Sequence, residues 1–289
     1  MKSAGDLQFR TLAAWTVAVA IVVVPALGWA SSRAHGPDVP VPVLLYHEIT
    51  PGPVSDRGMV VTASEFEAHM KALKEHGYTA ITLEELLSDM SGRGSLPLRP
   101  VLITFDDGYE SVYKYAYPVL RKNGMRAAAF VVGSTIGTPN HLSPAEISEM
   151  IASGVVEVGS HTYGGHGGTS SDPHIASWTL EQLDADFSEM AAFLRKHSVR
   201  SVPALAYPFG KVTRAIVQAA RRSGFLAGFT TREGAASWDD SPMLLPRITV
   251  WPGNDGAALL AKIQRALSYV PLRRNLDPVT SDADSLRGW

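Results

Sequence analysis

Residues 101–108 read Val101-Leu102-Ile103-Thr104-Phe105-Asp106-Asp107-Gly108, an apolar run that ends in two adjacent carboxylates and a glycine. The run has the length and composition of a buried strand, and Asp-Gly commonly begins the turn that follows one. Two neighbouring carboxylates repel each other, which is unfavourable unless a cation or a catalytic role stabilises the pair. We therefore predict a strand that leads into either a solvated turn or a functional site.

Apolar runs of this kind recur along the chain, separated by amphipathic stretches. The candidate strands are Val41–Tyr46, Thr79–Ile81, Val101–Phe105, Ala127–Val132, Val155–Val158, Ala204–Tyr207, Leu226–Thr230 and Leu245–Val250. Strands that alternate with helices indicate an α/β protein with a parallel sheet. The chain has no glycine-rich dinucleotide-binding loop, which favours a closed barrel over an open doubly wound sheet. We predict a distorted (β/α)7-8 barrel that forms a single catalytic domain.

Helix boundaries are marked by caps. The predicted capping boxes pair Ser64 with Glu67, Thr82 with Glu85, Ser143 with Glu146, and Thr179 with Gln182. Helices are predicted to stop at Gly77, Gly124, Gly154 and Gly224, where a left-handed cap is expected. In a barrel of this kind, functional residues lie where the strands run into the following loops.

A second polar cluster follows the strand at Val155–Val158. The loop Gly159-Ser160-His161-Thr162-Tyr163-Gly164-Gly165-His166 places two histidines five residues apart. Imidazole is the commonest neutral metal ligand, and two imidazoles with one carboxylate leave a coordination position open for water. Together with the paired aspartates, these histidines predict a His-His-Asp metal site.

Here the sequence resembles the polysaccharide deacetylases of carbohydrate esterase family 4, which carry the NodB-homology domain. The resemblance rests on T-F-D-D-G followed by S-H-T-x-x-x-H and extends over residues 41–250. Most of that family spaces the two histidines four residues apart. The wider spacing here is similar to the branch that deacetylates poly-β-1,6-N-acetylglucosamine in biofilms.

The resemblance implies roles for the matching residues. Asp106 would be the general base, and Asp107, His161 and His166 would bind the metal. The segment Ala206-Tyr207-Pro208-Phe209-Gly210 resembles the third family motif, in which the backbone N–H of Phe209 would stabilise the oxyanion. The alternative interpretation of this segment is a simple Pro-Gly turn.

Two departures from the family pattern concern catalytic groups. The arginine that usually opens the third motif is replaced by Ala206, and we expect Arg247 to supply the charge partner of Asp106. The leucine-x-histidine motif is absent near Val250 but occurs as Leu45-Tyr46-His47. Because the first and last strands of a barrel can be neighbours, we assign His47 as the general acid; the alternative is a rim histidine bonded to loop backbone.

Other residues with suitable chemistry match no motif. Trp238 and Trp251 follow the later strands and could stack on sugar rings or simply pack. The remaining histidines downstream of the first strand are interpreted as surface or structural residues; they are His69, His76, His141, His174 and His197.

Composition excludes several classes. The chain contains 289 residues with 26 basic and 28 acidic side chains, which gives no electrostatic reason to expect a nucleic-acid partner. It contains no cysteine, so thiolate catalysis, disulfides and cysteine metal sites are excluded. The metal ligands must therefore be His, Asp or Glu, which suits Zn²⁺, with Co²⁺ or Ni²⁺ as possible substitutes.

The N-terminus predicts export. Lys2 and Arg10 precede an uncharged apolar run over residues 11–30, which has the length of a bilayer span and also a small-residue end typical of signal-peptide cleavage. We expect residues 1–30 to be a signal peptide or membrane anchor, 31–40 a linker, 41–268 the catalytic domain and 269–289 a surface tail. The protein is thus expected in the periplasm, the cell envelope or outside the cell, with membrane contact if the segment is retained.

These features predict metal-dependent hydrolytic N-deacetylation of an N-acetylglucosamine-containing polysaccharide, with the β-1,6-linked polymer as the first choice. Chitin oligomers and peptidoglycan are alternative substrates because they carry the same N-acetyl group. A glycoside hydrolase and a non-catalytic polysaccharide-binding module are alternative functions. The sequence does not identify protein partners.

Overall fold

The computed structural model describes residues 40–53, 58–197, 199, 201–237 and 240–268. The predicted signal or anchor at 1–30, residues 31–39 of the predicted linker and the tail at 269–289 lie outside the described residues. Among the residues that are described, no helix is both long and apolar enough to cross a membrane.

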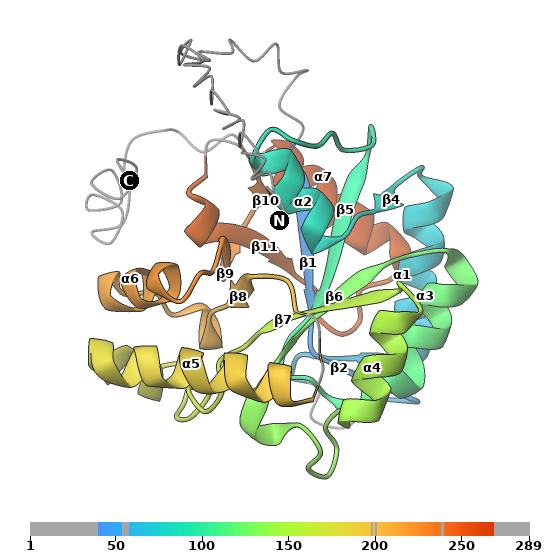
Figure 1. Cartoon of the computed structure of the whole chain (residues 1–289). Helices are drawn as coiled ribbons and strands as arrows, with labels where there is room; N and C mark the ends of the chain where they lie inside the picture. Colours follow the sequence, from blue (N-terminus) through green and yellow to red (C-terminus); the bar gives the residue numbers. More distant parts are fainter. Residues whose placement is uncertain (1–39, 54–57, 198, 200, 238–239, 269–289) are drawn as a thin grey trace, which may run out of the picture. The chain divides into compact units, whose positions relative to one another are not determined.

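Seven parallel strands form a closed barrel, as predicted (Figure 1). The first strand, β1, completes the ring by pairing with β5 on one side and with β11, the last strand, on the other. The order around the ring is β1 (Val41–Tyr46), β5 (Pro100–Phe105), β6 (Ala127–Val131), β7 (Val156–Ser160), β8 (Ala204–Ala206), β9 (Ala227–Glu233) and β11 (Leu245–Thr249).

The remaining strands are short and lie outside the ring. The predicted strand at Thr79–Ile81 exists as β4 (Thr79–Ala80). It pairs only with Pro100 and Val101 at the start of β5, before the residues of β5 that pair with β1 and β6, so it is not a member of the ring. Three strands were not predicted: β2 (Glu48–Thr50) and β3 (Val60–Thr62), which pair with each other, and β10 (Ala235–Ala236), which is antiparallel to β1. Each has only two or three residues, too few to produce a sequence periodicity.

Helices follow the strands and surround the barrel. Figure 1 shows α1, α3 and α4 along one side and α5 and α6 along another. The α-helices are α1 (Ala63–Glu75), α2 (Leu83–Met90), α3 (Tyr117–Asn123), α4 (Pro144–Ala152), α5 (Leu180–Lys196), α6 (Arg214–Arg222) and α7 (Gly256–Ser268). The single-turn elements are η1 (Val112–Ala116), η2 (Gly133–Thr135), η3 (His174–Ser177), η4 (Pro208–Gly210) and η5 (Pro242–Leu244).

Three of the four predicted capping boxes are present, at α2, α4 and α5. The prediction for α1 was wrong: its box pairs Thr62 with Glu65, and Ser64 lies inside the helix. The helix starts earlier because Thr62, the last residue of β3, offers its hydroxyl to the N–H of Glu65 at 3.2 Å. The four predicted glycine stops all have positive φ, as expected for left-handed caps.

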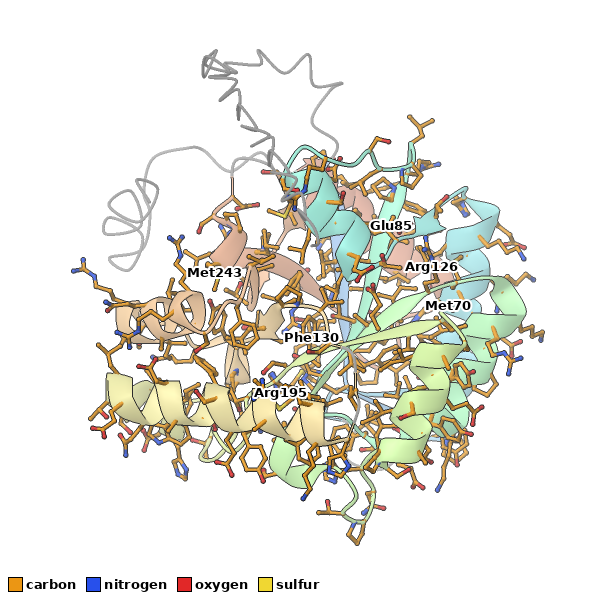
Figure 2. All side chains as sticks on the ribbon, viewed as in Figure 1. Met70, Glu85, Arg126, Phe130, Arg195 and Met243 are labelled. Atoms are coloured by element: carbon orange, nitrogen blue, oxygen red, sulfur yellow. The ribbon has the colours of Figure 1, made fainter. Side chains whose placement is uncertain are left out.

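Alternate strand residues fill the barrel interior. Phe130 lies near the centre of the view in Figure 2, and its ring centroid is 5.3 Å from that of Phe229 on β9. The intervening residues of β1, β5 and β6 face outward and belong to a separate apolar cluster with α1, α3 and α7. Since side chains alternate along a strand, Asp106 continues the inward face of Leu102 and Thr104 into the end of the barrel.

Candidate metal centre and active site

The predicted site residues come from different strands but gather at one end of the barrel. Asp106 and Asp107 follow β5, and His161 follows β7. The N–H of Asp106 donates to the carbonyl of Tyr46 on β1, and the N–H of His161 donates to the carbonyl of Val131 on β6. Strand pairing therefore fixes the backbone of these residues at the carboxyl end of the parallel sheet.

Asp107, His161 and His166 converge on one point. Their ligand atoms all lie within 4.8 Å of one another. Oδ1 of Asp107 is 3.3 Å from Nε2 of His161 and 3.1 Å from Nε2 of His166. The His161 side chain is buried, whereas that of His166 is 26% exposed, so the cluster is open to solvent on the His166 side.

The orientation of His161 is set by a backbone carbonyl. Nδ1 of His161 lies 2.7 Å from the carbonyl oxygen of Ala206 on β8, which can only accept a hydrogen bond. Nδ1 therefore carries the proton in the neutral ring, and Nε2 presents a lone pair toward Asp107. Oδ1 of Asp107 is buried and has no hydrogen-bond partner among the described residues. The Nε2 lone pair and the carboxylate oxygen repel each other unless a proton or a metal cation lies between them.

The electrostatics of the cluster agree with that requirement. Burial would raise the pKa of Asp107, but the two imidazoles hold it well below its usual range. Burial alone would lower the pKa of His161, but the carboxylates of Asp106 and Asp107 outweigh burial and raise it above its usual value. The pocket thus stabilises positive charge, and two histidines with one carboxylate fit a divalent cation such as Zn²⁺.

Asp106 is paired with Arg247, the residue expected to replace the missing arginine of the third motif. Nη1 and Nη2 of Arg247 donate to the two carboxylate oxygens at 2.8 and 2.7 Å. Arg247 is 0% exposed and Asp106 is 2% exposed, so the ion pair is inside the barrel. Nε of Arg247 also donates to the carbonyl of Thr230 at 2.9 Å. Burial would raise the pKa of Asp106, but Arg247 and His161 hold it below its usual value.

His47 lies at the same end of the barrel, one residue after β1. Its Nδ1 is buried without a hydrogen-bond partner among the described residues, which does not fit a rim histidine held by loop backbone. Burial lowers the pKa of His47, although Asp106 and Asp107 act in the opposite direction. The imidazole of His47 is therefore close enough to Asp106 and Asp107 for both negative charges to act on its pKa.

Phe209 belongs to η4 and has a left-handed backbone, with φ of 55°. Its ring stacks on the imidazole of His166, with centroids 4.7 Å apart and an interplanar angle of 29°. The ring contact was not predicted from the sequence, and it restricts the orientation of a histidine of the Asp107-His161-His166 cluster. The expected role of the Phe209 N–H at an oxyanion stays a prediction.

Sequence reasoning missed two residues near the cluster. Burial and the nearby charge of Asp107 raise the pKa of the Tyr109 phenol to about 12, and the Tyr109 ring stacks on His141 with centroids 5.4 Å apart. Asp186 on α5 accepts hydrogen bonds from the backbone N–H groups of Tyr163 and Gly164. A signal for Asp186 was present, because it interrupts the apolar face of an otherwise amphipathic helix.

The unassigned histidines and tryptophans have ordinary environments where they are described. His69 is buried, with Nδ1 3.1 Å from the hydroxyl of Tyr46 and Nε2 2.7 Å from the carbonyl of Asn254, which agrees with a structural role. Trp251 is 47% exposed after β11, and Trp238 lies outside the described residues. The proposed stacking of tryptophan on sugar rings stays a prediction.

Comparison with known proteins identifies the family. A family model described as polysaccharide deacetylase matches residues 93–228, which include Asp106, Asp107, His161 and His166. The chain is 34% identical over 224 residues to "Putative polysaccharide deacetylase YxkH" of Bacillus subtilis, covering 78% of this chain and 76% of that protein. It is 32% identical over 210 residues to the poly-β-1,6-N-acetyl-D-glucosamine N-deacetylase of Staphylococcus epidermidis, covering 70% and 71%.

A solved structure gives the same result. IcaB from Ammonifex degensii superposes with a TM-score of 0.69 at 29% identity, covering 77% of this chain and 96% of that chain. With the closed barrel and the convergent Asp-His-His cluster, these similarities show that the chain belongs to the polysaccharide deacetylase family and is a metal-dependent hydrolase that removes N-acetyl groups from carbohydrate.

Proposed function

We propose that this enzyme deacetylates poly-β-1,6-N-acetylglucosamine. The convergence of Asp107, His161 and His166 beside the Asp106–Arg247 ion pair carries the proposal, since it joins a cation site to a carboxylate base. The choice of polymer is supported by the five-residue histidine spacing and by the similarity to the poly-β-1,6-N-acetyl-D-glucosamine N-deacetylase of Staphylococcus epidermidis.

Zn²⁺ is the cation we propose for the site, with Co²⁺ or Ni²⁺ as substitutes, and Asp107, His161 and His166 as its protein ligands. A cation bound there would lower the pKa of a coordinated water and polarise the acetyl carbonyl. The partial exposure of His166 leaves that side of the cluster accessible to water and to a sugar.

The chain's own residues would move the protons. Asp106 accepts the proton of the attacking water, because Arg247 keeps this buried carboxylate ionised and aligned. His47 donates a proton to the leaving amine nitrogen as the C–N bond breaks. Burial lowers the pKa of His47, which makes its imidazolium a stronger acid but leaves a smaller fraction of it protonated at neutral pH. The Phe209 N–H is assigned to the oxyanion.

The alternative functions fit this geometry less well. A glycosidase uses two carboxylates about 5–9.5 Å apart, one of which transfers a proton to the glycosidic oxygen. Here burial opposes ionisation, but Arg247 at Asp106 and the imidazoles at Asp107 hold the pKa values of both carboxyls below their usual range, so neither has a proton to donate to a glycosidic oxygen. A non-catalytic binding module would have no need for an ionised buried carboxylate next to a cation site.

We also propose that the protein acts outside the cytoplasm, exported by residues 1–30 and held at the membrane if that segment is retained. The basic residues before the apolar run at 11–30 support this placement. Cell fractionation with mass spectrometry of the mature N-terminus tests it: a cytosolic protein that retains Met1 would contradict export.

The decisive experiment measures acetate release from N-acetylated β-1,6-glucosamine oligomers, with chitin oligomers and peptidoglycan as competing substrates. Acetate should disappear after chelation and return with Zn²⁺, Co²⁺ or Ni²⁺, while the polymer length stays constant. New reducing ends without acetate would indicate a glycosidase. A preference for chitin oligomers or peptidoglycan would contradict the choice of polymer but leave the deacetylase activity intact.

A further inference from the structure

The first of the four residues between the two histidines has an unusual backbone conformation. Thr162 has φ of 71°, in the left-handed region that β-branched residues rarely enter. Its own N–H donates to the hydroxyl of Ser160 at 3.1 Å, and its carbonyl accepts from the N–H of Gly133 at 3.0 Å. A residue in a strained conformation persists only when surrounding contacts hold it in place. Contacts to the neighbouring residues of the loop are therefore expected to stabilise the conformation of Thr162.

One carboxylate supplies those contacts. Asp186 accepts hydrogen bonds from the N–H of Tyr163 on Oδ2 at 2.9 Å and from the N–H of Gly164 on Oδ1 at 2.7 Å. The N–H of Gly165 also bonds to this carboxylate. Three consecutive backbone donors, which directly precede His166, are thus bound by a single side chain. Hydrogen bonds to an ionised acceptor are stronger than neutral ones and fix geometry more tightly.

The position of Asp186 is unfavourable for packing alone. It is 6% exposed on the face of α5 that buries Leu183, Phe187 and Met190. Burial raises the pKa of its carboxyl, although the three N–H groups act in the opposite direction. A buried carboxylate on an apolar helix face is expected only where its partners require it. The buried apolar side chains pack α5 against the barrel. Through Asp186, the loop at residues 163–165 is therefore hydrogen-bonded to a helix that is fixed in position.

We propose that Asp186 is a positioning residue for the metal centre. By binding the backbone of residues 163–165, it sets the direction from which His166 approaches, so that Nε2 of His166 lies 3.1 Å from Oδ1 of Asp107. The inference rests on the cation site proposed above. Nothing in the sequence spacing of His161 and His166 alone would bring the second imidazole to this point, because the loop contains two flexible glycines.

The test compares the full-length wild-type protein with Asp186→Asn, which keeps the side-chain size but replaces one acceptor oxygen with a donor. The Zn²⁺ dissociation constant, measured by competition with a fluorescent chelator, should rise about 10–100-fold, as is typical when an outer partner of a metal ligand is removed. The visible absorption of the Co²⁺-loaded protein should also change, since it reports the coordination geometry.

Glu157 provides a matched control. It is a partly buried carboxylate on β7 that accepts backbone N–H bonds from Leu83 and Glu84 at the start of α2, and burial raises its pKa as well. Glu157→Gln should lower the melting temperature without changing the Zn²⁺ dissociation constant or the Co²⁺ spectrum. Asp186→Glu, which keeps both acceptor oxygens, should recover part of the Zn²⁺ affinity and serves as the second variant if Asp186→Asn does not fold.

The outcomes separate the two proposals. If the wild-type protein binds no Zn²⁺, the cation site itself is wrong. If the wild-type protein binds Zn²⁺ and a folded Asp186 variant binds it within twofold, with an unchanged Co²⁺ spectrum, the positioning role is wrong and Asp186 only stabilises the fold.

Discussion

The buried ion pair between Arg247 and Asp106 makes the sharpest prediction. Replacing Arg247 with Met removes the guanidinium but keeps an unbranched apolar side chain in the barrel. Asp106 would lose both hydrogen bonds from Arg247 and remain 2% exposed, as a buried charge without its partner. Breaking such a pair typically destabilises a protein by about 3–5 kcal/mol. Because each kcal/mol lowers the Tm of a domain of this size by about 2–4 °C, the Tm should fall by about 6–20 °C.

The assay is urea unfolding of the metal-free protein at pH 7, repeated for Asp106→Leu and for the double variant. Replacing both charges with apolar side chains should recover most of the loss, because no unpaired charge remains. Arg126→Met is the matched control: Arg126 also binds both oxygens of a carboxylate, that of Glu85, but on the surface (Figure 2). Its effect should not exceed about 1 kcal/mol.

The pH dependence has a definite sign. In the wild-type protein the pKa of Asp106 is depressed, so its stabilising contribution is present above the unfolded value near 3.9 and is lost as the pH falls through the folded value. Without Arg247 the carboxyl is expected to take up a proton at higher pH, so the deficit of Arg247→Met should shrink between pH 7 and pH 4. A loss below about 1 kcal/mol at pH 7, or a double variant no more stable than Arg247→Met, would refute the reasoning.

Three further predictions concern histidines and the proposed base. Asp106→Asn should keep its bound metal while turnover falls about 100-fold or more, whereas His161→Ala should lose metal as measured by atomic absorption; full activity of Asp106→Asn would remove the base assignment. His47→Ala should lower turnover about 100-fold at unchanged metal content, and a loss of metal would make His47 a ligand instead. Burial lowers the pKa of His69, so the unfolded chain binds a proton at a pH where the folded chain does not. The free energy of unfolding of the wild-type protein should therefore fall as the pH drops below about 6.5, by at most ~1.4 kcal/mol per pH unit. His69→Gln should flatten that part of the stability curve, and an equal slope in both proteins would contradict the assignment.

The barrel could be predicted from the sequence because its signals are local. Each strand of the ring is an apolar run, and most helices carry a cap at one or both ends. The α1 boundary was misplaced because Thr62 and Ser64 both precede a glutamate by three residues, and only the end of β3 decides between them. The pairing of β2 with β3 has no local signal, since it depends on two segments meeting across a loop.

The site could be predicted in part because several of its residues belong to sequence motifs. Asp107, His161 and His166 belong to motifs, and the contact between Arg247 and Asp106 followed from the arginine missing at Ala206. Asp186 belongs to no motif: its partners are backbone N–H groups, which every residue but proline has, so sequence cannot show that they converge.

The closure of the ring by β1 between β5 and β11 has a consequence for the newly made protein. The proposed acid, His47, follows the first strand of the domain, while the partner of the proposed base, Arg247, lies on the last. A nascent chain that ends before β11 would contain all three proposed cation ligands, but the charge of Asp106 would be unpaired and one edge of β1 would lack its neighbour β11. Catalytic competence should therefore arrive in a single late step, after residue 249, rather than grow as the chain emerges.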